Sequence, residues 1–584
     1  MRIAAALRKA TDALLAEIGP AGHWTGELSS SALSTATALT ALAEVDRQLG
    51  DSRNAALIAG GLRWLAEHRN ADGGWGDTVR SRSNISTTAL CWAAFAAARA
   101  DAEYPAIVAD AAGWLAQARG EESLPAAIAA RYGKDRTFSV PILMMLALSG
   151  RIGWRHVMPL PFELAALPHQ FFGALQLPVV SYALPALIAI GQVIHRHRPS
   201  LNPLARLIRG LTKRRTLRVL ESIQPENGGF LEATPLTSFV TMSLAGSGRA
   251  DHRVTRRGAT FLRASVLADG SWAIDTNLAT WTTTLAIKAL AFQPAALKPE
   301  QRIDLRAWLL GQQYRTEHPY THAAPGGWAW TDLPGGVPDA DDTPGALLAL
   351  LALGVIDGPT HIAGLAGCRW LMGLQNRDGG IPTFCRGWGA LPFDRSSPDL
   401  TAHTLRAWSA WRMHFPKDER APLDTATARA IAFLGKAQRA DGSWLPLWFG
   451  NEHAPGDENP LYGTAHVVIA LRDVAGRGSE IESGHAQRGI GWLAAAQNDD
   501  GGWGGVKGVP SSVEETALAV KALAGTCEVR AVERGVEWLV GRVESGAWRE
   551  PAPIGFYFAK LWYSERLYPL IWTVGALGRV TALR

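Results

Sequence analysis

The chain has 584 residues, of which 47% are hydrophobic and 19% are charged, so it can bury a large core and is not disordered. The net charge of +5 is spread along the chain without a basic tail, and no nucleic-acid partner is expected. The four cysteines lie far apart with no CxxC pair, which argues against a disulfide scaffold, a zinc knuckle and an iron–sulfur site.

The chain opens with MRIAAALRKATDALLAEIG, which has the apolar spacing of an amphipathic helix. Charges are distributed throughout this segment, whereas a secretory signal has an uninterrupted apolar stretch, so no signal is predicted. A reducing, cytoplasmic location is therefore expected.

Turns that end in tryptophan recur along the chain. Tryptophan is unusually frequent, with 23 residues against 16 Phe and 9 Tyr. Gly-Gly-Trp or Gly-Ser-Trp turns end at Trp75, Trp272, Trp328, Trp444 and Trp503, and weaker copies end at Phe230 and Ile381. From Phe230 onward the copies are about 40–65 residues apart, the length of a helix pair in a repeat array. Each turn follows a helical pattern, and three are preceded at the same spacing by Gln375, Gln438 and Gln497. The sequence predicts an all-α array of antiparallel helix pairs, either an open solenoid or a closed toroid.

The segment Leu164–Ile194 has no formal charge and is longer than the about 20 residues that cross a bilayer. Pro168, Pro178 and Pro185 interrupt it, which favours a buried or membrane-dipping segment over a spanning helix. Basic residues follow it: Arg196, Arg198, Arg206, Arg209, Lys213, Arg214, Arg215 and Arg218. They form either a solvated helix face or a patch that binds anionic lipid headgroups.

An acidic cluster, Asp339, Asp341 and Asp342, lies directly before Thr343 and Pro344, which predict the start of a helix that ends near Gly354. The helix dipole alone favours acids at such a position. An EF-hand, a DDxxD magnesium site, an HExxH zinc site and a P-loop do not fit the sequence. The remaining chemical interpretation is a general acid in an apolar place, because burial and like charges keep one carboxyl protonated.

The segment Asp339-Ala340-Asp341-Asp342-Thr343 resembles the DxDD motif of class II terpene cyclases, and the Gln…Gly-x-Trp repeats resemble the QW motifs of triterpene cyclases. The resemblance is greatest to the squalene–hopene cyclases and covers nearly the whole chain, including Asp269-Gly270-Ser271-Trp272…Trp281 and Leu461-Tyr462-Gly463-Thr464. It implies two α/α barrels, one of residues 1–20 and 290–584 with the acid motif, the other an insertion of residues 21–289 with the membrane-facing segment. It further implies an active cavity between the barrels and a monotopic protein on the cytoplasmic face of the cell membrane, with a homodimer as a candidate assembly.

The resemblance also implies roles for single residues. Asp341 would donate the proton, with Asp339 and Asp342 beside it. His403, in the segment Asp399-Leu400-Thr401-Ala402-His403, would hydrogen-bond to Asp341, and Tyr462 would help to reload it. The substrate cavity would be lined by Trp281, Trp330, Phe384, Trp448, Phe556 and Tyr557. No metal ligand and no cofactor is implied.

The predicted function is proton-initiated cyclisation of a linear polyprene, squalene above others, to hopene or a related triterpene. Aromatic faces suit this chemistry, since they stabilise carbocations without capturing them. Three alternatives stay open: a class II diterpene-type cyclase acting on a prenyl diphosphate, a toroid that binds lipid without catalysis, and an α/α-toroid glycosidase with two carboxylates. The termination end of the hopene reaction is not matched, because its Gln-Pro is not found and the C-terminal pattern reads Ile554-Gly555-Phe556-Tyr557-Phe558.

Overall fold

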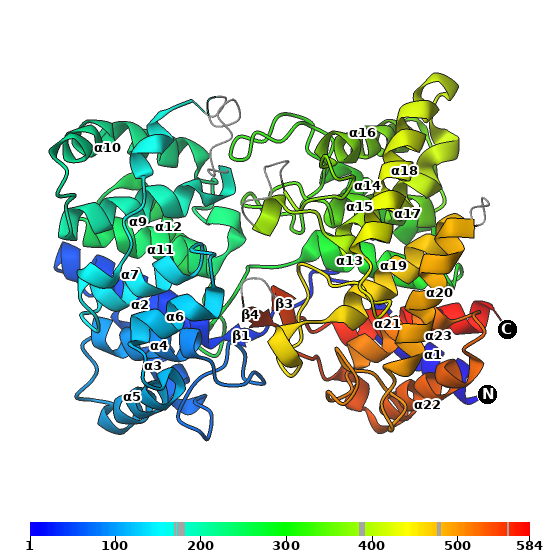
Figure 1. Cartoon of the computed structure of the whole chain (residues 1–584), viewed down its shortest axis with the longest axis horizontal. Coiled ribbons are helices and arrows are strands. Elements are labelled where there is room, and N and C mark those ends of the chain that lie inside the picture. The colour runs from blue at the N-terminus through cyan, green and yellow to red at the C-terminus, as the bar shows by residue number, and fades with distance from the viewer. Residues whose placement is uncertain (169–170, 172–180, 385–391, 476–479, 557–559, 584) are drawn as a thin grey trace.

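The computed structural model describes residues 1–168, 171, 181–384, 392–475, 480–556 and 560–583 (Figure 1). Its regular secondary structure is almost entirely helical, which confirms the all-α prediction, and the helices form two units side by side. Strand pairing in the described part is limited to two small antiparallel sheets. They join β1 (Ser30–Ser31) to β2 (Trp272–Ala273) and β3 (Ile554–Phe556) to β4 (Leu561–Tyr563).

The N-terminal unit is a barrel of two layers. Its inner helices contact one another in a closed ring and are α2 (Ala32–Leu49), α4 (Ile85–Ala97), α7 (Ser139–Leu148), α9 (Leu184–His197) and α11 (Thr234–Gly246). Its other helices pack outside them and are α3 (Ala55–Glu67), α5 (Pro105–Arg119), α6 (Leu124–Tyr132), α10 (Pro203–Ile223) and α12 (Arg253–Ala264).

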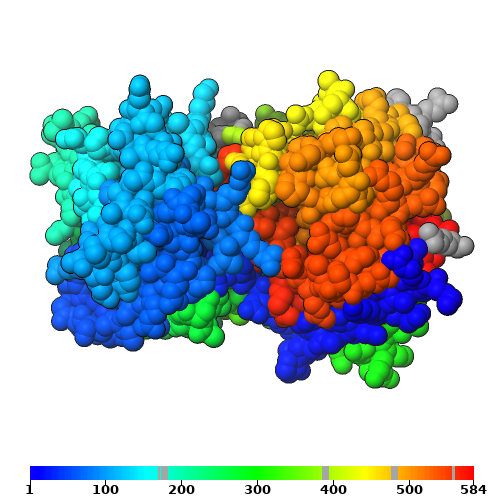
Figure 2. Space-filling model, turned by 90° about the horizontal axis from the view of Figure 1, so that it is seen from below, coloured from blue at the N-terminus to red at the C-terminus, as the bar shows by residue number. Residues whose placement is uncertain are grey.

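The C-terminal unit is a second barrel. Its inner ring is closed by α13 (Ala279–Leu290), α15 (Asp342–Ala352), α17 (Pro398–Trp411), α19 (Pro460–Ala475), α21 (Val513–Leu523) and α23 (Tyr568–Ala582). Its outer helices are α1 (Arg2–Ala16), α14 (Pro299–Gly311), α16 (Gly358–Leu374), α18 (Arg420–Ala437), α20 (Glu480–Ala495) and α22 (Val529–Ser545). Figure 2 shows the blue N-terminal residues against the orange and red C-terminal helices of this unit.

The two layers follow from side-chain patterning. The inner helix α2 is an Ala/Leu/Thr sequence whose residues are buried without interruption from Ala32 to Asp46. The outer helix α12 buries one face and carries its arginines on the other. A helix that is apolar all round belongs inside a large fold, whereas an amphipathic one covers it.

The recurring tryptophans are structural, and each fixes an outer helix to an inner one. In the last repeat the indole N–H of Trp503 donates to the Leu493 carbonyl at 2.7 Å, and its backbone N–H donates to Thr516 Oγ1 at 2.9 Å. The Gln497 amide donates to the carbonyls of Gly501 and Ala531, at 2.8 and 2.9 Å. Polar groups in this tight, buried turn are thus paired, which lowers the cost of burying them.

The same bonds show how the chain crosses between the barrels. Trp24 follows α1, and its indole N–H donates to the Leu14 carbonyl at 2.7 Å, while its backbone N–H donates to Thr283 Oγ1 of α13 at 3.1 Å. Trp272 follows α12, and its backbone N–H donates to Thr35 Oγ1 of α2 at 3.0 Å. The segment that leaves the C-terminal barrel after α1 therefore binds α13 of that barrel. The segment that leaves the N-terminal barrel after α12 binds α2 of that barrel.

This crossing corrects one predicted boundary. Helix α1 packs on α22 and α23, in the C-terminal barrel where the sequence placed it. Helix α13 packs between α15 and α23 in the same barrel, although the predicted boundary at residue 290 assigned it to the inserted one. The sequence pattern did not show this, because the docking of Thr283 on Trp24 is a long-range contact.

No helix in the described residues is both long and apolar enough to cross a bilayer. Of the uncharged segment, α9 begins at Leu184 with Pro185 in its first turn, where proline is tolerated. Residues 169–170 and 172–180 of that segment lie outside the described part.

We expect Gln375→Leu to destabilise the C-terminal barrel. The Gln375 amide, which is 2% exposed, donates to the carbonyls of Gly379 and Ala426 at 2.8 and 2.9 Å. Its loss leaves two buried acceptors without this donor, at about 1–3 kcal/mol each. Thermal unfolding should show a lower midpoint than for Gln117→Leu, a matched change at an exposed site, and equal midpoints would contradict the assigned role.

Candidate active site

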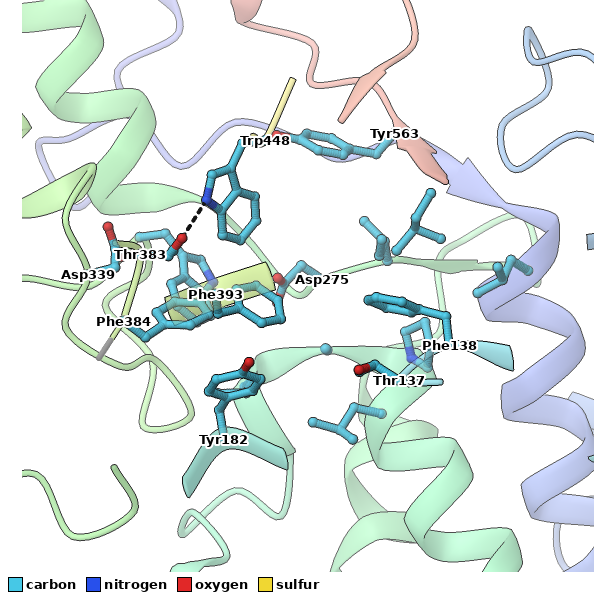
Figure 3. Close-up of a pocket in the computed structure, with 18 of the residues that line it drawn as sticks. Thr137, Phe138, Tyr182, Asp275, Asp339, Thr383, Phe384, Phe393, Trp448 and Tyr563 are labelled. Atoms are coloured by element: carbon cyan, nitrogen blue, oxygen red, sulfur yellow. Dashed lines mark hydrogen bonds between the residues drawn. The ribbon is translucent and has the colours of Figure 1, made fainter. Parts of the chain in front are cut away.

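A cavity of about 290 Å³ lies between the two barrels and is lined by both (Figure 3). The N-terminal barrel contributes Phe138, Tyr182 and Phe239, and the C-terminal barrel contributes the acid motif and most of the aromatic rings. The lining is almost entirely apolar, and the described residues that form it include no Lys or Arg. Such a cavity suits a long hydrocarbon.

The acid motif lies at the start of α15, and its first member holds the helix N-terminus. Asp339 Oδ1 accepts the backbone N–H groups of Asp341 and Asp342, both at 2.8 Å. Thr343, predicted at the start of this helix, does not cap it, because its hydroxyl instead accepts the N–H of Trp328 at 3.0 Å. Since Asp339 satisfies the free amides, the Asp341 carboxyl is left to face the cavity, with 22% of its side chain exposed there.

Burial dominates the protonation of the three acids. It raises the pKa of Asp339 and of Asp341 to about 7, and in Asp341 the Lys288 cation opposes the rise. Burial and the neighbouring Asp339 raise the pKa of Asp342 well above its usual range. The cluster therefore retains protons at neutral pH, as a general acid requires.

His403 contacts the predicted acid directly. Its Nδ1 lies 2.7 Å from Asp341 Oδ1, and the ring is buried on α17, 3% exposed. On its other side Nε2 lies 3.0 Å from Lys288 Nζ. Burial, followed by the nearby cations of Lys288 and Arg406, lowers the pKa of His403 well below its usual range. The imidazole is therefore neutral and connects the acid to a lysine.

Asp399 and Tyr462 lie behind the cavity wall, and neither is among the described lining residues. Asp399 accepts a hydrogen bond from the Ser397 hydroxyl, and burial raises its pKa to about 7. Tyr462 packs against Phe449 and His466, with ring centroids 4.2 and 4.4 Å apart. The structure thus places both near the acid without direct access to a substrate.

The four described aromatic residues predicted for the wall, Trp281, Trp330, Phe384 and Trp448, line the cavity. The Phe384 ring lies 5.9 Å from that of Trp330 and 6.0 Å from that of Trp448, edge to face with the latter. Trp448 donates its indole N–H to Thr383 Oγ1 at 2.9 Å, as Figure 3 shows, which fixes the ring. Trp281 is held in the same way by the Tyr568 hydroxyl, at 2.9 Å.

Sequence reasoning missed several residues of the site. Eight are aromatic residues of the lining: Tyr132, Phe138, Tyr182, Phe239, Phe393, Phe449, Tyr563 and Tyr568. Asp275 also lines the cavity, and burial with the Glu232 charge raises its pKa well above the usual range. It is therefore neutral, and does not offer a carboxylate that would capture a carbocation. Lys288 had a signal, because it follows Trp281 at a spacing that returns to the same helix face.

Two predicted residues cannot be placed. Tyr557 and the side chain of Phe556 lie outside the described residues, although the backbone of Phe556 pairs with Leu561 in the β3–β4 sheet. In the described part, no three His, Cys, Asp or Glu side chains gather so that they could hold a metal ion.

Residues 277–582 match the family model of the squalene-hopene cyclase C-terminal domain, and residues 7–202 match that of the N-terminal domain. The chain is 26% identical to a squalene hopane cyclase of Aspergillus fumigatus, aligned over 92% of this chain and 84% of that protein. It is 25% identical to a probable squalene–hopene cyclase of Sinorhizobium fredii, over 99% of this chain and 96% of that one. It is 28% identical to the enfumafungin synthase of Hormonema carpetanum, over 60% of this chain but 28% of that longer protein. The fold resembles that of ent-copalyl diphosphate synthase from Streptomyces platensis, with a TM-score of 0.60 at 18% identity over 100% and 99% of the two chains. The chain belongs to the squalene–hopene cyclase family of class II terpene cyclases.

Proposed function

We propose that the protein catalyses the proton-initiated cyclisation of a linear polyprene, preferably squalene, to a polycyclic triterpene. The observation that carries the proposal is the position of Asp341, a protonated carboxyl at the wall of an apolar, aromatic cavity. It is backed by a buried neutral imidazole, His403, 2.7 Å away.

The first step is proton transfer from Asp341 to a terminal alkene of the substrate. A carboxyl is a weak acid toward carbon, so the site must stabilise the carboxylate that the transfer leaves behind. His403 does this with a hydrogen bond, Lys288 with its charge, and the N-terminus of α15 with its dipole. These interactions strengthen as negative charge develops, and so they lower the barrier.

The later steps require that positive charge be held where water is excluded. The rings of Trp281, Trp330, Phe384 and Trp448 surround the cavity, and each desolvated cation–π contact contributes about 2 kcal/mol. Asp339 and Asp342 retain protons beside Asp341, so they offer less negative charge to capture a cation. Asp399 and Tyr462 lie near the acid on the side away from the cavity. Tyr462 belongs to the surroundings of Asp341 while the acid regains its proton.

The diphosphate alternative is disfavoured by the cavity. A prenyl diphosphate needs cations or magnesium beside its phosphates, whereas the described lining carries neither lysine nor arginine. Incubation with squalene and with geranylgeranyl diphosphate, each with EDTA or with added Mg²⁺, separates the two. We expect cyclised product, identified by mass and NMR, from squalene in EDTA. Product from the diphosphate alone, and only with Mg²⁺, would overturn the proposal.

We also propose that the protein binds a membrane surface through α10, at the cytoplasmic face of the cell membrane. Leu204, Leu207 and Leu211 are 63%, 59% and 74% exposed and fall one helical turn apart. The exposed Arg206, Arg214 and Arg215 flank them. An exposed apolar stripe bordered by arginines suits the boundary between lipid headgroups and acyl chains. Arg209 does not contribute as expected, because its guanidinium pairs with Glu163 at 3.0 Å.

Replacing Arg206, Arg214 and Arg215 together with glutamine should weaken binding to anionic vesicles. Each charge contributes about 1 kcal/mol near such a surface, so the loss should approach about 10²-fold at low salt and shrink as salt rises. Leu204→Ser with Leu211→Ser should weaken binding at all salt concentrations, while Ile362→Ser, an exposed residue of α16, should not. Vesicle co-sedimentation measures both, and equal binding by all variants would make α10 an ordinary solvated helix.

A further inference from the structure

Lys288 is a half-buried cation that does not line the cavity, so substrate binding gives no reason for its position. It projects from α13 to His403 Nε2, 3.0 Å away, and its ammonium lies 5.6 Å from the centre of the Trp281 ring. Burial, followed by the positive charge of Arg406, lowers the pKa of Lys288 to about 7. A lysine of this kind exchanges its proton readily near neutral pH, whereas an ordinary lysine does not.

Three groups form a continuous chain of contacts. Asp341 Oδ1 lies 2.7 Å from His403 Nδ1, and His403 Nε2 lies 3.0 Å from Lys288 Nζ. Both distances are those of hydrogen bonds. Because the imidazole has one nitrogen on each contact, a proton that arrives at one side can be matched by a proton that leaves from the other.

The chain of contacts leads away from the cavity. Asp341 lies at the N-terminal end of the inner helices, whereas Lys288 lies near the C-terminal end of α13. Beyond it, charged or titratable groups of other inner helices lie close enough to influence one another's pKa: Arg406 and His403 of α17, His466 and Asp473 of α19, Lys521 of α21 and Arg579 of α23. Arg406 pairs with Asp473 at 2.7 Å, and these side chains are 21% and 36% exposed, so this end of the charged cluster reaches solvent.

We propose that Lys288 returns the proton to Asp341 through His403, and that this proton enters along the lumen of the C-terminal barrel and not through the substrate cavity. This inference rests on the proposed function, in which each turnover leaves Asp341 as a carboxylate. It gives the site separate routes for a hydrocarbon and for a proton, so that the acid is reloaded without admitting water to the carbocation cavity.

The transfer balances in protons and charge. An N–H bond of the Lys288 ammonium breaks as one forms at His403 Nε2, and the Nδ1–H bond of His403 breaks as an O–H bond forms on Asp341. The lysine becomes a neutral amine, the carboxylate becomes a carboxylic acid, and His403 stays neutral in its other tautomer, which must return to the Nδ1–H form before the next transfer. The amine then takes a proton from solvent water at the Arg406–Asp473 end of the lumen. Lys288 therefore acts through His403 and is a positioning residue.

The test compares one turnover with many. Enzyme in excess over squalene reports protonation by the acid as purified, and squalene in excess reports reloading. Because Lys288 also stabilises the Asp341 carboxylate with its charge, we expect Lys288→Met to slow product formation only modestly in the first case. In the second it should stop after one product per enzyme, with a steady-state rate at least about 10²-fold lower. Lys288→Gln should behave in the same way. It replaces the methionine variant in the test if thermal unfolding shows that Lys288→Met does not fold.

Lys288→Arg separates proton transfer from charge. Arginine keeps the cation but does not release a proton in proteins, so a relay predicts no rescue. Rescue by arginine, or an equal loss in single and multiple turnover, would make Lys288 an electrostatic neighbour only, and an unchanged steady state would remove it from the route. Lys436→Met, on the surface helix α18, is the control. If wild-type enzyme in excess gives no cyclised product, the proposed function itself fails, and the lysine variants play no part in that result.

Discussion

Asp341→Asn should abolish turnover while the protein stays folded. The amide keeps the size of the carboxyl but has no acidic proton to give to an alkene, and the apolar cavity supplies no substitute acid. Loss of a positioned general acid costs at least about 10²–10⁴-fold. Product formation from squalene, followed by gas chromatography, measures the loss. Asp304→Asn, an exposed aspartate of α14, is the matched control.

The pKa of Asp341 also sets how the rate of cyclisation depends on pH. Its pKa of about 7 means that the reactive, protonated form is present below that pH and is lost above it. The wild-type rate should therefore fall as pH rises through about 7. A variant Asp341→Asn that retains more than a tenth of the wild-type rate, or a rate that rises through this range, would remove Asp341 from the role.

His403→Ala should produce the second large loss, about 10²-fold or more in rate. The imidazole is the group that hydrogen-bonds to the carboxylate formed on Asp341, and without it that charge is left buried with fewer partners. Because this weakens the acid itself, the first turnover should slow as well as the later ones. Lys288→Met should slow the first turnover far less than the later ones, and this difference distinguishes the two positions.

The control for His403 is His156→Ala, an exposed residue of the N-terminal barrel. Thermal unfolding should confirm that both proteins are folded before rates are compared. If His403→Ala gave the wild-type rate and pH profile, the residue would be a packed core histidine that touches the acid without serving it.

The helix-pair repeat could be predicted because its signals are local. A helical pattern, a glutamine and a Gly-Trp turn lie within one short segment, and the structure uses them as in the turn at Trp503. The crossing between barrels depends instead on Trp24 meeting Thr283 and on Trp272 meeting Thr35. These pairs are distant in sequence, and the Trp24 turn reads Gly-His-Trp, without the Gly-Gly-Trp or Gly-Ser-Trp of the other tryptophan turns. The predicted boundary at residue 290 was wrong for that reason.

In the candidate site, too, local motifs could be predicted from the sequence and long-range contacts could not. The acid and its histidine could be found because their motifs resemble those of a known family, and the structure brings Asp341 and His403 into contact. The lysine behind them carries no motif and is brought to His403 only by closure of the inner ring. Tyr563 reaches the cavity through the β3–β4 pairing, and the sequence of such short strands does not predict their register.

The central claim is that a proton from Asp341 becomes a carbon-bound hydrogen of the product. Cyclisation of squalene in buffered D₂O tests it most directly, because the carboxyl exchanges with solvent before each turnover. The account predicts one deuterium on the carbon that is protonated first, at the end of the chain where ring closure begins, located by mass spectrometry and NMR. A cyclised product without deuterium at that carbon would show that the reaction does not start by protonation and would contradict the account.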